Sequence, residues 1–319
     1  MRSLAVGLAG LLALGLAWFP VGVAAQSAGK VPRVGVLDGG PPPTRWPSPL
    51  FLDALGRLGY VVGQNIVFER RYAAGVTDRL PALARALAGL DVDLILTNGT
   101  PATRAAKEAT LRIPIVFNLS ADPVRSGLVA SFARPGGNLT GFAYGIYADK
   151  QLEVLKETMP GLSRVACLCP RDMLSLDAIR ALQLQVQFLD PQSPAGLDRA
   201  FASARSGRAE AVLVSDVAWF SEAVLQRIAD LAAGSRLPAI GPGKTFTVFG
   251  GLASYGPRAG QAPPRVLAYM DRILKGAKPA DLPVEQPTIF ELVINVKTAK
   301  ALDLTIPQTL LLRADELIQ

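Results

Sequence analysis

The short segment that begins at Asn98 carries the groups best suited to holding a small anion. Asn98, Gly99, Thr100 and Thr103 follow a continuously apolar stretch and open an Ala-rich one. Gly99 allows the backbone to approach a bound group closely. The first N–H groups of a helix, together with the two threonine hydroxyls, suit a carboxylate. A structural interpretation stands beside this one, because Thr100 is a good N-cap and Pro101 a good first helical residue.

Two acidic residues offer the complementary charge. Asp122 precedes Pro123 and repeats the pattern of a cap followed by proline, and Asp216 ends an apolar stretch in the second half of the chain. Either carboxylate is able to pair with an ammonium group. Either is equally able to cap a neighbouring helix.

Aromatic residues next to these positions are candidates for apolar walls of a binding site. Tyr144 and Trp219 are the two that we select, and Trp46 and Phe220 lie in comparable places. The alternative for each is ordinary core packing, which is the commoner use of an aromatic side chain.

Acid–base, metal and cofactor chemistry find little support in the sequence. The chain contains no histidine, which removes the commonest general base and zinc ligand. No Gly-x-Ser-x-Gly or Gly-x-x-x-x-Gly-Lys motif occurs, and Gly39-Gly40-Pro41 is not a dinucleotide fingerprint. We therefore expect no catalytic residues, no metal ligands and no cofactor, and we do not expect an enzyme.

The two cysteines, Cys167 and Cys169, lie within one apolar stretch. In a strand they point to the same face. A bridge between them would close a very tight ring, so we expect two small buried residues without a disulfide.

The charge distribution argues against nucleic acid as a partner. The formal net charge is +7, from 33 basic and 26 acidic residues among 319. The basic residues are scattered singly and are not interleaved with aromatic ones, which is typical of a solvated surface.

The first 25 residues have the composition of a secretory signal peptide. Arg2 precedes an uncharged apolar segment over 4–19, Pro20 interrupts it, and Val23-Ala24-Ala25 supplies the small residues of a cleavage site. We expect cleavage after Ala25, the alternative being an uncleaved N-terminal anchor. No cysteine follows the apolar segment, so a lipid-anchored form is not expected.

Beyond residue 30, short apolar stretches alternate with helical patterns, which predicts parallel sheets wrapped by helices. The expected strands cover 33–37, 66–72, 92–97, 113–119, 164–168, 184–189, 211–215, 237–240, 252–255 and 290–295. The expected helices cover 50–58, 78–89, 100–109, 122–132, 149–158, 172–182, 197–206, 221–233, 264–275 and 296–302. Ligands of open α/β sheets bind beyond the carboxyl ends of the strands. This rule selects the loops 38–44, 98–103 and 120–124 in the first half, and 170–173, 216–220 and 241–245 in the second.

Several segments, in this order and spacing, resemble the substrate-binding proteins of ABC transporters, specifically the tryptophan/tyrosine type. Quoted by position, they are 58–66 (LGYVVGQNI), 97–102 (TNGTPA), 113–117 (IPIVF), 121–124 (ADPV), 274–288 (LKGAKPADLPVEQPT) and 304–307 (LTIP). Each is weak alone, but together they span nearly all of the chain after residue 30.

The resemblance implies a type I periplasmic-binding fold: two doubly wound parallel-sheet lobes joined by a three-crossover hinge. Carried onto this chain, lobe one covers 31–140 plus 257–283, and lobe two covers 144–254 plus 286–319. The crossovers are expected near 138–144, 252–257 and 282–288. The family implies a periplasmic monomer that closes on a small ligand, here an amino acid with an apolar or aromatic side chain, and docks on an ABC permease in the inner membrane. The alternative is a ligand-sensing subunit that docks on a membrane receptor.

Overall fold

A computed structural model describes residues 30–43, 45–120, 122–144, 147–189, 191, 193–215 and 221–319, apart from the side chains at 119, 120 and 172. The expected signal segment, 1–25, lies outside these residues. Among the residues that the structure describes, no helix combines the length and apolar character needed to cross a membrane.

The strands form two separate sheets. The first contains β1 (Arg33–Asp38), β2 (Val67–Tyr72), β3 (Leu94–Asn98), β4 (Ile115–Ser120) and β5 (Leu139–Ala143), in the order β2-β1-β3-β4-β5. All of its pairings are parallel. The second has the order β12-β11-β10-β9-β8-β6-β7. Its strands are β6 (Arg164–Leu168), β7 (Gln185–Leu189), β8 (Ala211–Val214), β9 (Ala239–Gly241), β10 (Ala253–Pro257), β11 (Phe290–Asn295) and β12 (Glu316–Ile318).

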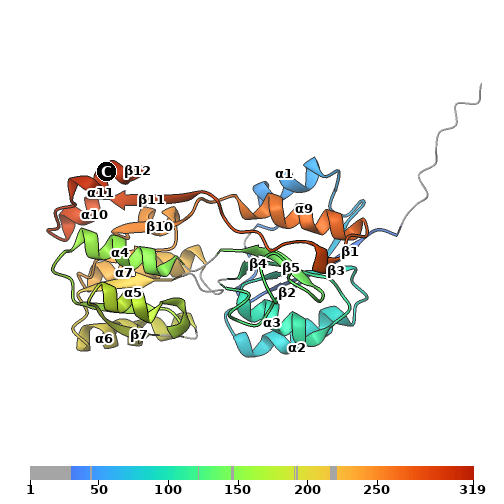
Figure 1. Cartoon of the computed structure of the whole chain (residues 1–319), viewed down its shortest axis with the longest axis horizontal. Coiled ribbons are helices and arrows are strands. Elements are labelled where there is room, and N and C mark those ends of the chain that lie inside the picture. The colour runs from blue at the N-terminus through green and yellow to red at the C-terminus, as the bar shows by residue number, and fades with distance from the viewer. Residues whose placement is uncertain are drawn as a thin grey trace, which may run out of the picture. The chain divides into compact units, whose positions relative to one another are not determined.

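Helices cover both faces of the first sheet. They are α1 (Pro49–Arg57), α2 (Leu80–Ala88), α3 (Thr100–Ala109) and α9 (Ala262–Leu274). Figure 1 shows α1 and α9 on one face and α2 and α3 on the other, and the two apolar clusters agree with this arrangement. Residues of one strand alternate between these clusters, since Leu94 and Leu96 pack toward α9 whereas Ile95 packs toward α2 and α3.

The second sheet is covered in the same way. Its helices are α4 (Ala148–Thr158), α5 (Leu176–Ala181), α6 (Leu197–Ser206), α7 (Glu222–Gly234), α8 (Lys244–Val248), α10 (Val296–Ala301) and α11 (Gln308–Arg313). One cluster joins the sheet to α4 and α11, with Leu152 and Leu310 among its members. The other joins it to α6, α7 and α8, with Phe201, Ile228 and Phe246. Short 3-10 turns occur at Thr77–Arg79, Arg171–Met173, Pro194–Gly196 and Pro279–Asp281.

Doubly wound α/β sheets are therefore confirmed, with one departure from an all-parallel arrangement. β11 runs antiparallel to β10. The chain leaves the first sheet after β5, returns to it after β10 to form α9, and leaves again before β11. A helix that packs on the same sheet usually connects two parallel strands. No such helix of the second sheet connects β10 to β11, so β11 is free to run antiparallel.

The segment that leads to β11 first pairs with the edge of the first sheet. Glu285 forms a bridge with Phe142, its N–H donates to the Gly141 carbonyl at 3.0 Å, and its carbonyl accepts from Ala143 at 2.8 Å. The Thr140 hydroxyl donates to the Leu282 carbonyl at 2.8 Å. This edge of β5 is thereby covered by chain from far along the sequence.

Two local expectations are wrong. A helix was expected over 122–132, but the structure has turns there, because Gly127 adopts a positive φ of 69° and both Leu128 and Val129 bond back to the Pro123 carbonyl. The cysteines Cys167 and Cys169 are joined by a disulfide, where none was expected. Their Cα atoms lie 5.3 Å apart on one face of the chain, a separation that a bridge spans.

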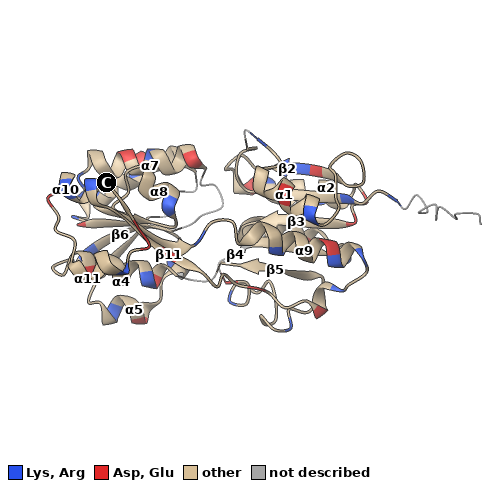
Figure 2. Ribbon diagram, turned by 90° about the horizontal axis from the view of Figure 1, so that it is seen from above, with Lys and Arg blue, Asp and Glu red and all other residues tan. Residues whose placement is uncertain are grey.

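Charged residues are interspersed along the helices around both sheets, as Figure 2 shows. Several form ion pairs across elements, including Arg227 with Asp198 at 2.7 Å and Arg313 with Glu157 at 2.8 Å. These pairs are solvent-exposed, so each contributes little to stability.

Candidate functional site

A row of polar side chains crosses the first sheet at the carboxyl ends of its strands. Asp38 is in register with Tyr72 on one side and with Asn98 on the other, and Asn98 is in register with Asn118. In-register residues of parallel strands point to the same face and lie about 5 Å apart. We call Tyr72, Asp38, Asn98 and Asn118 the polar row.

Hydrogen bonds run along the polar row in one direction. The Asn118 amide donates to Asn98 Oδ1 at 3.3 Å, and the Asn98 amide donates to Asp38 Oδ2 at 3.0 Å. Asp38 Oδ1 accepts the Gly40 N–H at 2.7 Å. The Asn98 side chain is therefore fixed with its donor toward Asp38, and the Asp38 carboxylate is held in a defined orientation.

Two polar atoms of the row have no hydrogen-bond partner among the residues that the structure describes. They are the Tyr72 hydroxyl and Asn118 Oδ1, both buried. A buried polar atom without a partner is uncommon in proteins, and a bound water, ion or ligand is one way to satisfy it. Arg70, on the same face of β2, acts on the Tyr72 hydroxyl and lowers its pKa, an effect that is smaller than that of burial.

The electrostatics of the row follow from burial. Burial raises the pKa of the Asp38 carboxyl above its ordinary value, although the Gly40 and Asn98 hydrogen bonds act in the opposite direction. Burial also raises the pKa of the Tyr72 hydroxyl. In both cases the charged form loses hydration that nearby groups do not fully replace.

The helix α3 begins one residue earlier than the sequence interpretation expected, which had Thr100 as the N-cap. Gly99 is the N-cap, with a positive φ of 82°, and Thr100 and Pro101 occupy the first two helical positions. Glycine is the residue that adopts such a φ without strain. Gly99, as the N-cap residue, brings no side chain to cap the helix, and the N-terminus of α3 lies at the carboxyl end of the sheet.

Thr103 is placed differently from the other three residues of this segment. It is fully buried, its hydroxyl donates to the Gly99 carbonyl at 2.8 Å, and it also shares a hydrogen bond of 2.8 Å with the Thr97 hydroxyl. The buried Thr103 hydroxyl thus stabilises the turn at Gly99, whereas Asn98 belongs to the polar row.

Asp122 serves as the cap of a turn. Its Oδ1 accepts the N–H groups of Val124 at 3.0 Å and Arg125 at 2.9 Å. Tyr144 follows β5 at the same end of the sheet, with its ring 5.7 Å from that of Phe142 in an edge-on contact. Asp216 and Trp219, the other two selected residues, lie outside the described residues, as does Phe220.

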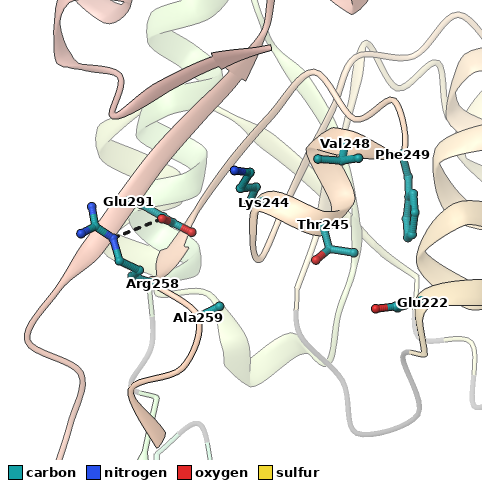
Figure 3. Close-up of a pocket in the computed structure, with 8 residues that line it drawn as sticks. All are labelled: Glu222, Lys244, Thr245, Val248, Phe249, Arg258, Ala259 and Glu291. Carbon is teal, nitrogen blue, oxygen red and sulfur yellow. Dashed lines mark hydrogen bonds and ion pairs between the residues drawn. The ribbon is translucent and has the colours of Figure 1, made fainter. Parts of the chain in front are cut away.

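In the second sheet, a hollow of about 440 Å³ adjoins the ends of β9 and β10, which run parallel. Figure 3 shows the side chains that line it, which are Glu222, Lys244, Thr245, Val248, Phe249, Arg258, Ala259 and Glu291. Its size is in the range of small-molecule sites. Its cations already have partners, since Lys244 pairs with Glu316 at 2.6 Å and Arg258 with Glu291 at 3.4 Å. Within the described part of the chain, no group of three His, Cys, Asp or Glu residues is arranged to hold a metal ion.

Comparison with known proteins identifies the family of this chain. The family model for ABC transporter substrate binding proteins matches residues 50–318. The chain belongs to this family. The tyrosine-binding protein of Clostridioides difficile is 25% identical over 264 residues, which cover 80% of this chain and 75% of that protein.

Solved structures agree on the fold of this substrate-binding protein. A conserved domain protein of Vibrio cholerae matches with a TM-score of 0.78 and 24% identity, covering 90% of this chain and 100% of the other. The ABC domain of Streptococcus pneumonia in complex with L-Trp matches with a TM-score of 0.77 and 23% identity, covering 91% and 100%. The fold is that of the two-lobed type I periplasmic-binding proteins, as the family resemblance implied.

Sequence reasoning selected Asn98 but missed Asp38, Tyr72 and Asn118. Asp38 lay in one of the selected loops, 38–44, as the first residue after an apolar strand. The sequence does show a polar residue at or near the end of each of the four expected strands, and this pattern could have indicated them. Their common register depends on strand pairing, which links residues far apart in sequence.

Proposed function

We propose that this chain is the extracytoplasmic solute-binding component of an ABC importer, and that it captures an amino acid with an apolar or aromatic side chain. The observation that carries the proposal is the polar row. It lies at the carboxyl ends of parallel strands, where α/β sheets bind ligands, in a chain of the substrate-binding family. A C. difficile relative is a tyrosine-binding protein, and a structural neighbour holds L-Trp, which favours aromatic amino acids as the first ligands to test.

In this proposal the two lobes close around the ligand. Gly99 and Thr100, next to Asn98, receive its carboxylate, and Tyr144 and Trp219 contribute apolar contact. The N–H groups at the start of α3 favour an anion through their partial positive charge. Thr103 supports this turn. Of the two carboxylates that the sequence offers for the ligand's amine, Asp122 caps its own turn and is left out of the proposed site, and Asp216 lies outside the described residues.

The proposal is tested by isothermal titration calorimetry of the purified protein against L-tyrosine, L-tryptophan, the branched amino acids, a sugar and a dicarboxylate. We expect heat of binding with at least one aromatic or branched amino acid, and compaction by small-angle scattering at saturation. Binding of the sugar or dicarboxylate, with no response to any amino acid, would contradict the proposed ligand class.

Export and partnership complete the proposal. We place the mature chain in the periplasm as a monomer, after cleavage behind Ala25, with an ABC permease of the inner membrane as its partner. Intact-mass measurement of the protein from a periplasmic extract checks the cleavage position. Ligand uptake by cells with and without the chain checks the importer role.

A further inference from the structure

The charge of Asp38 has no cationic partner among the residues that the structure describes. Its carboxylate is held by two neutral donors, the Gly40 N–H and the Asn98 amide. Arg70 acts on the neighbouring Tyr72, but its guanidinium lies over the Trp46 ring, 4.5 Å from the centroid, and forms no ion pair with Asp38. A partly buried carboxylate in this situation favours the arrival of a positive group.

The surroundings of Asp38 suit an ammonium group in particular. An ammonium group carries three N–H donors and no acceptor. Next to the carboxylate, the Tyr72 hydroxyl has no hydrogen-bond partner within the described part of the chain, whereas Asn118 lies two strands away from Asp38. The row thus presents one charged acceptor with the Tyr72 hydroxyl beside it as a further acceptor.

Asp122, the other described carboxylate in the loops at the ends of β1, β3 and β4, is already engaged. Its Oδ1 holds two backbone N–H groups of its own turn. Binding a ligand through this oxygen would compete with the turn. Asp38 differs, because the Asn118-to-Asn98 chain of hydrogen bonds orients its carboxylate without neutralising it.

We propose that the Asp38 carboxylate of the polar row binds the ammonium group of the captured amino acid, with Asn98 acting as the residue that positions it. This inference rests on the proposed function, since it presumes an amino-acid ligand. It assigns to Asp38 the role that sequence reasoning gave to Asp122 and Asp216. The carboxylate of the same ligand is then left for the N-terminus of α3, which begins next to Asn98.

The experiment pairs a protein variant with a ligand variant. Calorimetry measures the dissociation constant of whichever of L-tyrosine and L-tryptophan binds more tightly. A competition titration measures its analogue without the amino group, 3-(4-hydroxyphenyl)propionate or indole-3-propionate. The proteins are the wild type, Asp38→Asn and, as the matched control, Asp122→Asn. Asparagine keeps the size of each side chain and an acceptor oxygen, and thermal melts confirm that each variant is folded.

We expect Asp38→Asn to weaken binding of the amino acid by about 10- to 100-fold, the usual effect of losing a hydrogen bond to a charged group. The analogue should bind the wild type and Asp38→Asn alike, within threefold, or remain undetectable in both. Asp122→Asn should stay within threefold of the wild type for the amino acid.

Three results would overturn the assignment. They are an Asp38→Asn affinity within threefold of the wild type, an equal loss for amino acid and analogue, and a loss in Asp122→Asn as large as that in Asp38→Asn. In each of these cases the wild type still binds the amino acid, so the proposed function survives. If the wild type binds no amino acid, the proposed function and this assignment fail together.

Discussion

Replacement of Thr103 by valine tests how the turn at Gly99 is secured. Valine has nearly the shape of threonine and the same branching at Cβ, so packing and helix propensity change little. The substitution removes the hydroxyl that donates to the Gly99 carbonyl and shares a hydrogen bond with the Thr97 hydroxyl. Thr97 is itself only 2% exposed, so water does not replace the lost partner.

Removing one partner of a buried hydrogen bond lowers stability more than replacing both partners by apolar groups of the same shape. Leaving the buried Thr97 hydroxyl without its partner destabilises by about 1–3 kcal/mol. For a protein of this size that corresponds to a fall in Tm of roughly 2–4 °C per kcal/mol. The double variant, Thr97→Val with Thr103→Val, places two apolar side chains of the same shape against each other and should recover much of the loss. Thr103→Ser keeps the hydroxyl and serves as the control.

Urea unfolding followed by circular dichroism measures these four proteins and the single variant Thr97→Val, which completes the double-mutant cycle. We expect the double variant to be more stable than the sum of the two single losses predicts, with a coupling free energy of about 0.5–3 kcal/mol. Strictly additive losses, or a Thr103→Val variant as stable as the wild type, would refute the assigned role of this buried pair.

Two further predictions concern the first sheet. Gly141→Ala should destabilise the protein by about 3 kcal/mol or more, since an added Cβ would lie 2.1 Å from the Phe117 carbonyl oxygen and the backbone must shift. Gly161→Ala, where a Cβ meets nothing within 4 Å, should unfold at nearly the wild-type urea concentration and is the control. Because burial raises the folded-state pKa of Asp38, its protonation stabilises the fold at low pH, and this stabilisation is lost as pH rises through that pKa. As the pH rises from acidic to neutral, the Tm of the ligand-free wild type should therefore fall relative to the Tm of Asp38→Asn. A constant difference in Tm between the two proteins across this range would contradict the prediction.

Much of the fold was predictable because its signals are local. The strand Arg164–Leu168 and the helix Leu197–Ser206 have the bounds expected from sequence, as does Phe290–Asn295. Each is a continuous apolar or periodic stretch with a clear break at its ends. The helix Lys244–Val248 was not predicted because it is short and lies between glycine-containing loops. The strand β12 was not predicted because it has only three residues and lies at the edge of its sheet.

The site was only partly predictable, for a different reason. The rule about strand ends found the loops at Asn98 and Asp122 without knowledge of the pairing. It could not distinguish a carboxylate already bonded to its own turn, as in Asp122, from one presented across a sheet, as in Asp38. That distinction depends on which strands are neighbours.

The position of α9 in the chain has a consequence for the order of folding. Val266, Leu267 and Met270 of α9 cover Leu96 and Phe142 of the first sheet, and the Tyr269 hydroxyl donates to the Pro283 carbonyl at 2.5 Å. During synthesis, the strands of the first sheet emerge well before the helix that buries one of their faces. The sheet therefore stays incomplete until nearly all of the chain has left the ribosome. We expect the first sheet to become stable only after α9 has packed on it.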